Sequence, residues 1–182
     1  MSKKERIYIY IDGGNFYRRI FQDYKLHFLS FKLSNFCDDL VGKDREKIGT
    51  RYYIGQIKQY EGNPKSIELY NSQQRLLQKL KDEKIYTVLG RIQKYGNVYK
   101  EKGVDVRIGL DLLEGAYENR YDTALVISSD GDLSPAFELV KRKGKNIESV
   151  MFDCKSSLAL QKVANTFRIL NRNDLLPFAD SI

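Results

Sequence analysis

The most constraining feature of this chain is an apolar run that ends abruptly in a loop with two carboxylates. Residues 124–127 have the length and branching of a buried strand, and Ser128-Ser129-Asp130-Gly131-Asp132 follows directly. Ser134 and Pro135 then form a helix-start signal, with a hydroxyl to cap the first amides and a proline where no backbone donor is needed. The pattern therefore predicts Asp130 and Asp132 at the C-terminal end of a strand, where open α/β sheets bind ligands.

Two carboxylates this close in one loop repel each other, and a hard divalent cation would relieve the repulsion. An ordinary surface turn explains the same residues, because turns favour Asp and Gly. This loop alone leaves both interpretations open. An EF-hand loop is excluded, since that pattern needs Gly at its sixth position and Glu at its twelfth, where this chain has Pro135 and Lys141.

A similar junction stands near the N-terminus. Residues 7–11 are β-branched and aromatic, as in a central strand, and they lead into Asp12-Gly13-Gly14-Asn15. On a first helical turn the Asn15 side chain would face the same side as Asp12. The alternative is that Asp12 is only a helix N-cap. An aspartyl-phosphate phosphatase would want a second Asp at position 14, which is glycine.

A third candidate carboxylate is Asp105, which follows Lys102-Gly103-Val104 at the start of a predicted helix. Asp105 could simply cap this helix. Residues 106–117 are apolar enough to predict a largely buried helix. Asp111 lies in its interior among leucines, where a carboxylate without a partner would be expensive.

The order of the predicted elements indicates an α/β fold. Helical segments separate strands predicted at 7–11, 48–57, 85–89, 124–127, 147–152 and 167–170. This alternation predicts a mainly parallel central sheet with helices on both faces. Because the C-terminal ends of parallel strands share one edge, the four aspartates are expected to converge there, close enough to share an ion. Four carboxylates favour Mg²⁺ or Mn²⁺.

The charge of the chain favours a polyanionic partner. The net charge is +7 and the pI is about 9.2. Residues 91–102 interleave cations with tyrosines, as a single-stranded nucleic-acid surface would, although a plain hairpin with exposed lysines explains the same residues. The candidate phosphate contacts are Lys94, Lys100, Lys102, Lys141, Arg142 and Lys143.

Residue counts exclude several classes of protein. A single histidine rules out a two-histidine ribonuclease and a zinc site built from several histidines. No apolar run approaches the ~20 residues of a membrane span, and the charged N-terminus is not a signal peptide. Cys37 and Cys154 are expected to be free thiols in a reducing cytoplasm. The length predicts one domain over residues 1–182.

Three stretches together resemble the motifs of NYN domains, closest to the bacterial LabA-like branch of the PIN-like nuclease group. They are Ile11 to Asn15, Lys102 to Val106 with Asp111, and Ser128 to Pro135. The similarity covers residues 6–170. It implies a PIN-like three-layer architecture, with five or six parallel strands, and metal-dependent ribonuclease chemistry.

Carried over by position, the resemblance makes Asp12, Asp105, Asp130 and Asp132 the catalytic, metal-binding residues. Asn15, Ser129 and Asp111 would support the site; Ser129 stands where the family commonly has Gly or Asn. The expected cofactor is Mg²⁺ or Mn²⁺.

Two hypotheses follow. The first is a metal-dependent ribonuclease that cleaves single-stranded RNA internally, with water activated on the metal. The second is a non-catalytic RNA-binding or protein-interaction module that keeps the fold. A homodimer is left open by the sequence.

Overall fold

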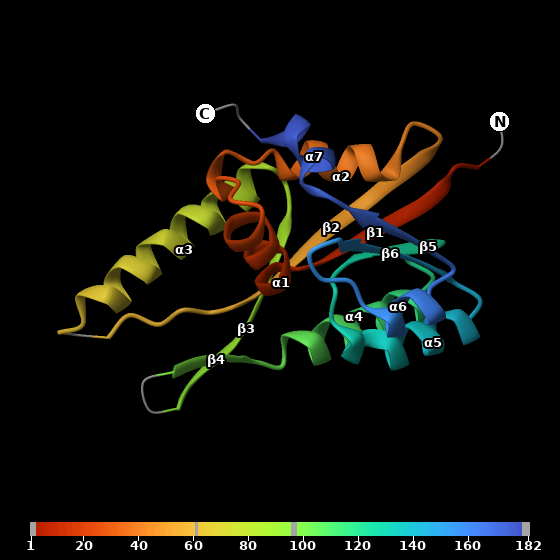
Figure 1. Ribbon diagram of the computed structural model, residues 1–182. Coiled ribbons are helices and arrows are strands. Elements are labelled where there is room, and N and C mark those ends of the chain that lie inside the picture. Colours follow the sequence, from red (N-terminus) through yellow and green to blue (C-terminus); the bar gives the residue numbers. More distant parts are fainter. Residues whose placement is uncertain (1–2, 61, 96–97, 180–182) are drawn as a thin grey trace.

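A computed structural model describes residues 3–60, 62–95 and 98–179. Within them, one sheet has the strand order β4-β3-β2-β1-β5-β6-β7 (Figure 1). The central strand β1 (Glu5–Asp12) lies between β2 (Arg45–Gly55) and β5 (Thr123–Ile127), and it is parallel to both. The first strand of the chain therefore ends in the middle of the sheet.

The outer strands complete the sheet. On one side lie β6 (Asn146–Phe152) and β7 (Thr166–Leu170), and on the other lies β3 (Tyr86–Tyr95), all parallel to their inner neighbours. Among the described strands only β4 (Val98–Lys102) is antiparallel, and it pairs with β3. Six parallel strands confirm the predicted sheet; β2 starts before residue 48, and β3 continues beyond residue 89.

Helices cover both faces of the sheet, which confirms the three-layer α/β architecture (Figure 1). One face carries α1 (Gly13–Tyr17), the π-helical turn η1 (Arg18–Asp23), the short turn η2 (Phe28–Ser30), α2 (Leu33–Val41), α3 (Pro64–Asp82), α7 (Arg172–Leu175) and the turn η4 (Leu176–Phe178). The other face carries α4 (Val104–Tyr117), the turn η3 (Gly131–Leu133), α5 (Ser134–Arg142) and α6 (Leu158–Val163).

Alternation along the strands builds a hydrophobic core on each face. Ile9 and Ile11 of β1 pack into the core beneath α1 and α2, whereas Tyr10 points into the core beneath α4 and α5. Each of these side chains is at most 1% exposed. The central strand is thus buried on both sides, as the apolar sequence predicts.

The start of α5 differs from the prediction. Ser134 is not the cap: Leu133 holds that position and makes no side-chain cap bond, although Pro135 does lie in the first turn. The extra turn η3 gives Ser134 helical dihedral angles already, so its hydroxyl cannot act as a cap. The side chain of Asp130 instead caps η3.

Helix α4 is less buried than its apolar sequence predicts. Ile108 and Leu112 are fully buried, but Val106, Leu110 and Tyr117 are 61%, 58% and 68% exposed. Only one stripe of the helix faces the sheet, so its other apolar residues remain at the surface.

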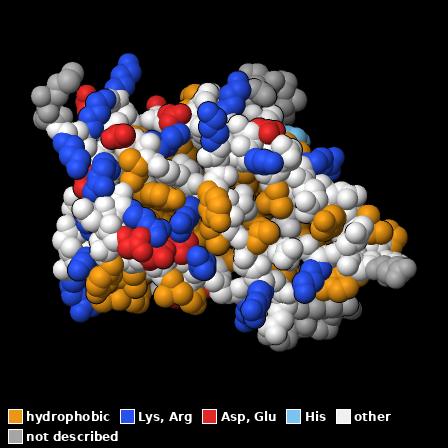
Figure 2. All heavy atoms as spheres, turned by 180° about the vertical axis from the view of Figure 1, so that it is seen from behind, with side chains coloured by type: hydrophobic (Ala, Val, Ile, Leu, Met, Phe, Trp, Pro, Cys, Tyr) orange, Lys and Arg blue, Asp and Glu red, His pale blue; other side chains and the backbone are white. Residues whose placement is uncertain are grey.

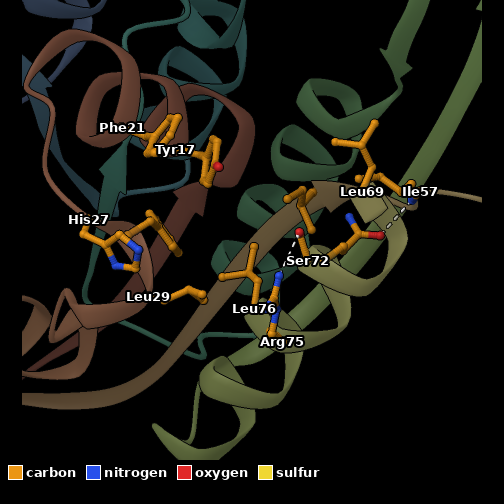
Figure 3. A pocket seen from close by; sticks show the side chains of 12 residues that line it. Tyr17, Phe21, His27, Leu29, Ile57, Leu69, Ser72, Arg75 and Leu76 are labelled. Atoms are coloured by element: carbon orange, nitrogen blue, oxygen red, sulfur yellow. Dashed lines mark hydrogen bonds between the residues drawn. The ribbon is translucent and has the colours of Figure 1, made fainter. Parts of the chain in front are cut away.

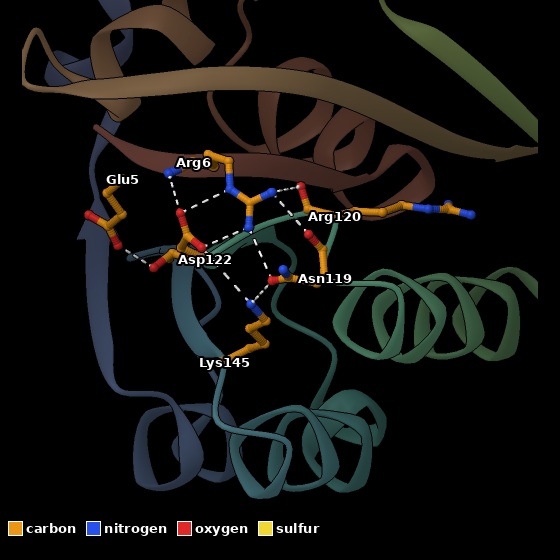
Figure 4. A network of polar contacts seen from close by, with 7 residues as sticks. Glu5, Arg6, Asn119, Arg120, Asp122 and Lys145 are labelled. Atoms are coloured by element: carbon orange, nitrogen blue, oxygen red, sulfur yellow. Dashed lines mark hydrogen bonds and ion pairs between the residues drawn. The ribbon is translucent and has the colours of Figure 1, made fainter. Parts of the chain in front are cut away.

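At the N-terminal edge of the sheet, charged groups are paired. The Arg6 guanidinium contacts the Asp122 carboxylate at 2.9 Å and donates to Asn119, and Lys145 lies 3.9 Å from Asp122 (Figure 4). Elsewhere, Cys37 is a buried free thiol and Cys154 an exposed one. In the described part of the chain, we find no helix with the length and apolarity needed to cross a membrane.

Candidate active site

Asp12 lies where β1 ends and α1 begins. One carboxylate oxygen, Oδ1, accepts a hydrogen bond from the backbone N–H of Asn15 at 3.0 Å, which makes Asp12 the N-cap of α1. The other, Oδ2, accepts from the Ser128 hydroxyl at 2.9 Å. Asp12 is only 9% exposed. The cap that the sequence suggested is therefore present, and the same carboxylate is also tied to the end of β5.

Ser128 was not among the predicted site residues, but it connects the Asp12 motif with the Asp130 motif. Besides donating to Asp12, its Oγ accepts from the backbone N–H of Asp130 at 3.0 Å. Asp130 in turn accepts from the backbone N–H of Asp132 at 3.1 Å. No local sequence pattern selects Ser128; its place beside Asp12 follows from the register, in which Ile11 of β1 pairs with Ile127, the last residue of β5.

The surroundings of Asp12 disfavour its charge. Burial raises the pKa of Asp12, its two hydrogen bonds partly oppose this, and the charges of Asp130 and Asp105 raise it further. These carboxylates are therefore close enough to interact. Regions separated by more than ninety residues thus come together at one sheet edge.

Asp105 and Asp132 lie at a groove between α4 and α5. Both line this groove, whose volume is about 240 Å³. Asp105 lies in the first turn of α4 and is not its cap; that position belongs to Gly103. Gly103 has a φ of +74°, a backbone conformation that suits glycine and turns the chain from β4 into α4. All four predicted aspartates thus lie around the ends of β1, β5 and the start of α4.

The oxygen donors at this edge suit a hard divalent cation. Two further oxygens there, Asn15 Oδ1 and Ser129 Oγ, are buried and lack a hydrogen-bond partner in the described structure. Within the same described residues, however, no three Asp, Glu, His or Cys side chains lie close enough together to hold a metal ion. The donor types fit Mg²⁺ or Mn²⁺. The prediction that the four aspartates stand close enough to share an ion is wrong for the described structure, because no three of their carboxylates are assembled there.

Asp111 has strong partners of its own. Its Oδ2 accepts from Arg51 at 2.7 Å and from the Tyr53 hydroxyl at 2.8 Å, and Oδ1 contacts Arg107 at 2.8 Å. These bonds tie α4 to β2, so any support that Asp111 gives to the site comes through the position of α4. No local sequence pattern pointed to Arg51, because this contact joins residues sixty positions apart.

The predicted phosphate-binding residues fall in two separate places. Lys102 ends β4 near the start of α4 and is exposed, while the side chains of Lys94 and Lys100 lie outside the described part of the structure. A second group, Lys141, Arg142 and Lys143, lies at the end of α5.

The α5 group is not brought to the aspartates. Helix α5 starts after the Asp130 loop and returns to the opposite edge, where β6 begins and Thr123 pairs with Asn146. The Lys141 ammonium donates to the Val163 carbonyl at 2.7 Å, and Lys143 lies 4.3 Å from the centre of the Tyr117 ring.

Comparisons with known proteins agree with this architecture. The crystal structure of a protein of unknown function from Vibrio parahaemolyticus is similar, with a TM-score of 0.71 and 23% identity over 96% of this chain and 99% of that one. This likeness supports the fold alone. No curated protein matches. The family model of the NYN domain matches residues 6–171, over which all three motifs lie, so the chain belongs to the NYN domain family.

Proposed function

We propose that this protein is a metal-dependent ribonuclease of the LabA-like branch that cleaves single-stranded RNA internally with Mg²⁺ or Mn²⁺. The NYN domain provides a PIN-like nuclease fold. The observation that carries the proposal is the buried Asp12 carboxylate, whose pKa is raised by burial and by Asp130 and Asp105 at the same sheet edge. Such an arrangement of like charges is typical of a site that binds a cation.

The four aspartates Asp12, Asp105, Asp130 and Asp132 would hold the metal. Asp12 is kept in one orientation by the amide of Asn15 and the hydroxyl of Ser128. The unpartnered Asn15 Oδ1 would support the metal ligands as an acceptor, and the Asn15 amide N–H and the Ser129 hydroxyl could donate to a bound phosphate. A bound cation would activate water and offset the charge that develops on the phosphodiester.

The RNA would approach along the basic hairpin. Lys94, Lys100 and Lys102 belong to β3 and β4, which project from the sheet beside α4 (Figure 1). Lys and Arg side chains are also spread over the face seen in Figure 2, around a compact acidic patch. Dispersed cations favour phosphate contacts that are largely indifferent to sequence.

The basic end of α5 would contact only a longer RNA. Helix α5 has nine residues and is about 14 Å long, so Lys141, Arg142 and Lys143 stand well away from the aspartates. Replacing the hairpin lysines by alanine should weaken the binding of short and long RNA, with a decrease of the log–log salt slope of about 0.7 for each lost contact. Replacing the α5 group by alanine should weaken the binding of long RNA only. Unchanged binding after both replacements would contradict this surface.

The decisive experiment is cleavage of a circular single-stranded RNA with Mg²⁺, with Mn²⁺ and with a chelator. The wild type should open the circle only when metal is present, which also identifies endonucleolytic cleavage. Asp130→Asn should lose at least about a hundredfold in rate, an effect typical of losing one preorganised charge-stabilising group. Asp122→Asn, at the opposite edge, is the matched control and should cleave normally.

A non-catalytic RNA-binding or protein-interaction module is the second candidate. It is favoured by the lack of a preassembled three-ligand cluster among the described residues. RNA binding by the wild type without cleavage under any of the metal conditions would establish this candidate instead. For both candidates we propose that residues 1–182 act as one domain in the cytoplasm; whether the protein is a homodimer is left open.

A further inference from the structure

A cleft with aromatic walls opens on the α1 and α3 side of the sheet. Its volume is about 300 Å³, at the lower end of the range typical of small-ligand sites. Tyr17 and Phe21 face it from α1 and η1, and Ser72 and Arg75 face it from α3 (Figure 3). An α-helix is about 10 Å across with its side chains, so this space suits a small planar group better than a helix.

The aromatic wall is unusually open to solvent. Tyr17 is 38% and Phe21 47% exposed, although both rings are large and apolar. The two rings are stacked, with centroids 5.5 Å apart and planes 23° apart, and Phe28 packs against Tyr17 from within. Stacked, half-exposed rings present a flat platform, the surface on which nucleobases stack in single-strand-binding proteins.

Part of the platform stands on an unusual stretch of backbone. Phe21 lies in the π-helical turn η1, which runs from Arg18 to Asp23. Such turns are rare and occur frequently at functional sites. The feature is therefore a second observation, independent of the cleft, that points to a role for this segment.

The polar groups of the cleft suit an RNA component. Arg75 lies at the surface and donates one hydrogen bond to the Ser72 hydroxyl at 3.2 Å, and His27 also faces the space. Gln73 is occupied by the backbone of Ile57 and Gly55. Among the described lining residues none is acidic, which disfavours a cationic peptide as the occupant.

The cleft lies near one of the four aspartates, Asp12. Tyr17 is the last residue of α1, the short helix that Asp12 caps, and five residues correspond to about 7.5 Å along a helix axis. Between them, the Tyr52 hydroxyl donates to the Gly13 carbonyl at 3.0 Å, and the Tyr52 ring contacts Phe28. A strand of RNA at Asp12 can therefore reach the aromatic platform.

We propose that this cleft binds a nucleobase of single-stranded RNA, stacked on the Tyr17–Phe21 pair, beside the phosphodiester at Asp12. The inference rests on the proposed ribonuclease function and deepens it. A base inside a duplex is already stacked between its neighbours and cannot enter such a cleft without being extruded. The site would therefore select single strands.

The test compares base-bearing RNA with an abasic oligomer of the same length, both fluorescently labelled. Binding is measured by anisotropy in the Asp130→Asn background with Mg²⁺, so that slow cleavage does not disturb the titration. Tyr17→Ala and Phe21→Ala should each weaken binding of the base-bearing RNA roughly 5- to 150-fold, the effect of losing one stacked base. Binding of the abasic oligomer should not change.

Phe167→Ala is the matched control, because Phe167 is also 47% exposed but lies on β7. It should leave both affinities unchanged. Tyr17→Phe and Phe21→Tyr keep the ring and should bind like the parent, which separates stacking from misfolding. The inference would be overturned if Tyr17→Ala and Phe21→Ala weakened the binding of both oligomers equally, or left the affinity for base-bearing RNA unchanged. If the wild type never cleaves RNA, but tighter binding of base-bearing RNA still depends on the two rings, the proposed ribonuclease function is refuted. The assignment of the cleft as a nucleobase site would stand in that case.

Discussion

Asp12 and Asp111 are both buried carboxylates, but their surroundings are opposite. Asp111 is 2% exposed and is bound by two arginines and a tyrosine hydroxyl. Asp12 is 9% exposed and is held by an amide and a hydroxyl, while the nearby charges that raise its pKa are Asp130 and Asp105. One carboxylate is thus matched by opposite charge and the other is surrounded by like charge.

The difference separates a structural role from a functional one. Opposite charges compensate the burial of Asp111, and its bonds fix α4 against the sheet. The arrangement around Asp12 costs stability, and nothing in the packing of β1 or α1 requires a second and third carboxylate there. Proteins keep such arrangements mainly at sites that bind or react, so this difference supports the proposal that the C-terminal sheet edge is the functional one.

Breaking the matched carboxylate should have the largest effect on stability. Asp111→Asn leaves Arg51 without its buried anionic partner, so we expect a loss of about 3 kcal/mol in the free energy of unfolding. Arg107 is 56% exposed and should contribute little to this loss. Urea unfolding at pH 7 measures the change.

Asp12→Asn is the matched substitution at the other carboxylate. Asn keeps one acceptor for the Asn15 amide and loses a buried charge, so the free energy of unfolding should change by no more than about 1 kcal/mol. Equal destabilisation by the two substitutions would contradict the distinction between the two carboxylates.

Added metal should produce the next largest effect. Mn²⁺ or Mg²⁺ at a hundredfold excess over its dissociation constant should stabilise the wild type by about 2.7 kcal/mol through mass action. Asp130→Asn should gain much less, because the substitution removes a proposed ligand. Thermal melts with and without metal measure both gains, and Asp122→Asn serves as the control that should respond like the wild type.

Without metal, removing one of the repelling carboxylates should be mildly stabilising. Asp130→Asn removes a charge that raises the pKa of Asp12, while Asn Oδ1 can still accept from the Asp132 amide. We expect a gain of up to about 1 kcal/mol at neutral pH. Asp132→Asn is the control: Asp132 is exposed, and its substitution should have a smaller effect. A metal-free Asp130→Asn protein that is less stable than the wild type would make Asp130 an ordinary turn residue.

The sequence was sufficient for the layers of the fold because strand and helix periodicities are local. The apolar runs that lead into Asp12 and Asp130 indicated two parallel strands, and parallel strands must end at a common edge. The proximity of these aspartates followed from this topology. Their individual orientations did not.

What the sequence could not give depends on contacts between distant segments. The pairing of Asp111 with Arg51 depends on how α4 is positioned over β2, and no local pattern encodes that position. Likewise, the aromatic cleft depends on how α1 and η1 pack beside α3, and no local pattern predicts that packing. The surplus turn η3 moved the cap from Ser134 to Asp130, a choice that single-residue propensities do not resolve.

The smallest effect concerns a second matched carboxylate, Asp122, at the opposite sheet edge. The hydrogen bond from Arg6 lowers its pKa from the ordinary 3.8 to about 2. A carboxyl with a lowered folded pKa contributes stability above its unfolded pKa and loses it as the pH falls from about 4 towards 2.

Asp12 has the opposite sign: its raised pKa makes stability fall as the pH rises above 3.8. Between pH 2 and 5 the free energy of unfolding should therefore rise less steeply with pH for Asp122→Asn than for the wild type. For Asp12→Asn it should rise more steeply. Because Asp122 is 38% exposed, 1 M salt should largely remove its contribution. Parallel pH profiles for all three proteins would show that neither carboxylate titrates differently on folding, and the contrast between the two edges would then have no electrostatic basis.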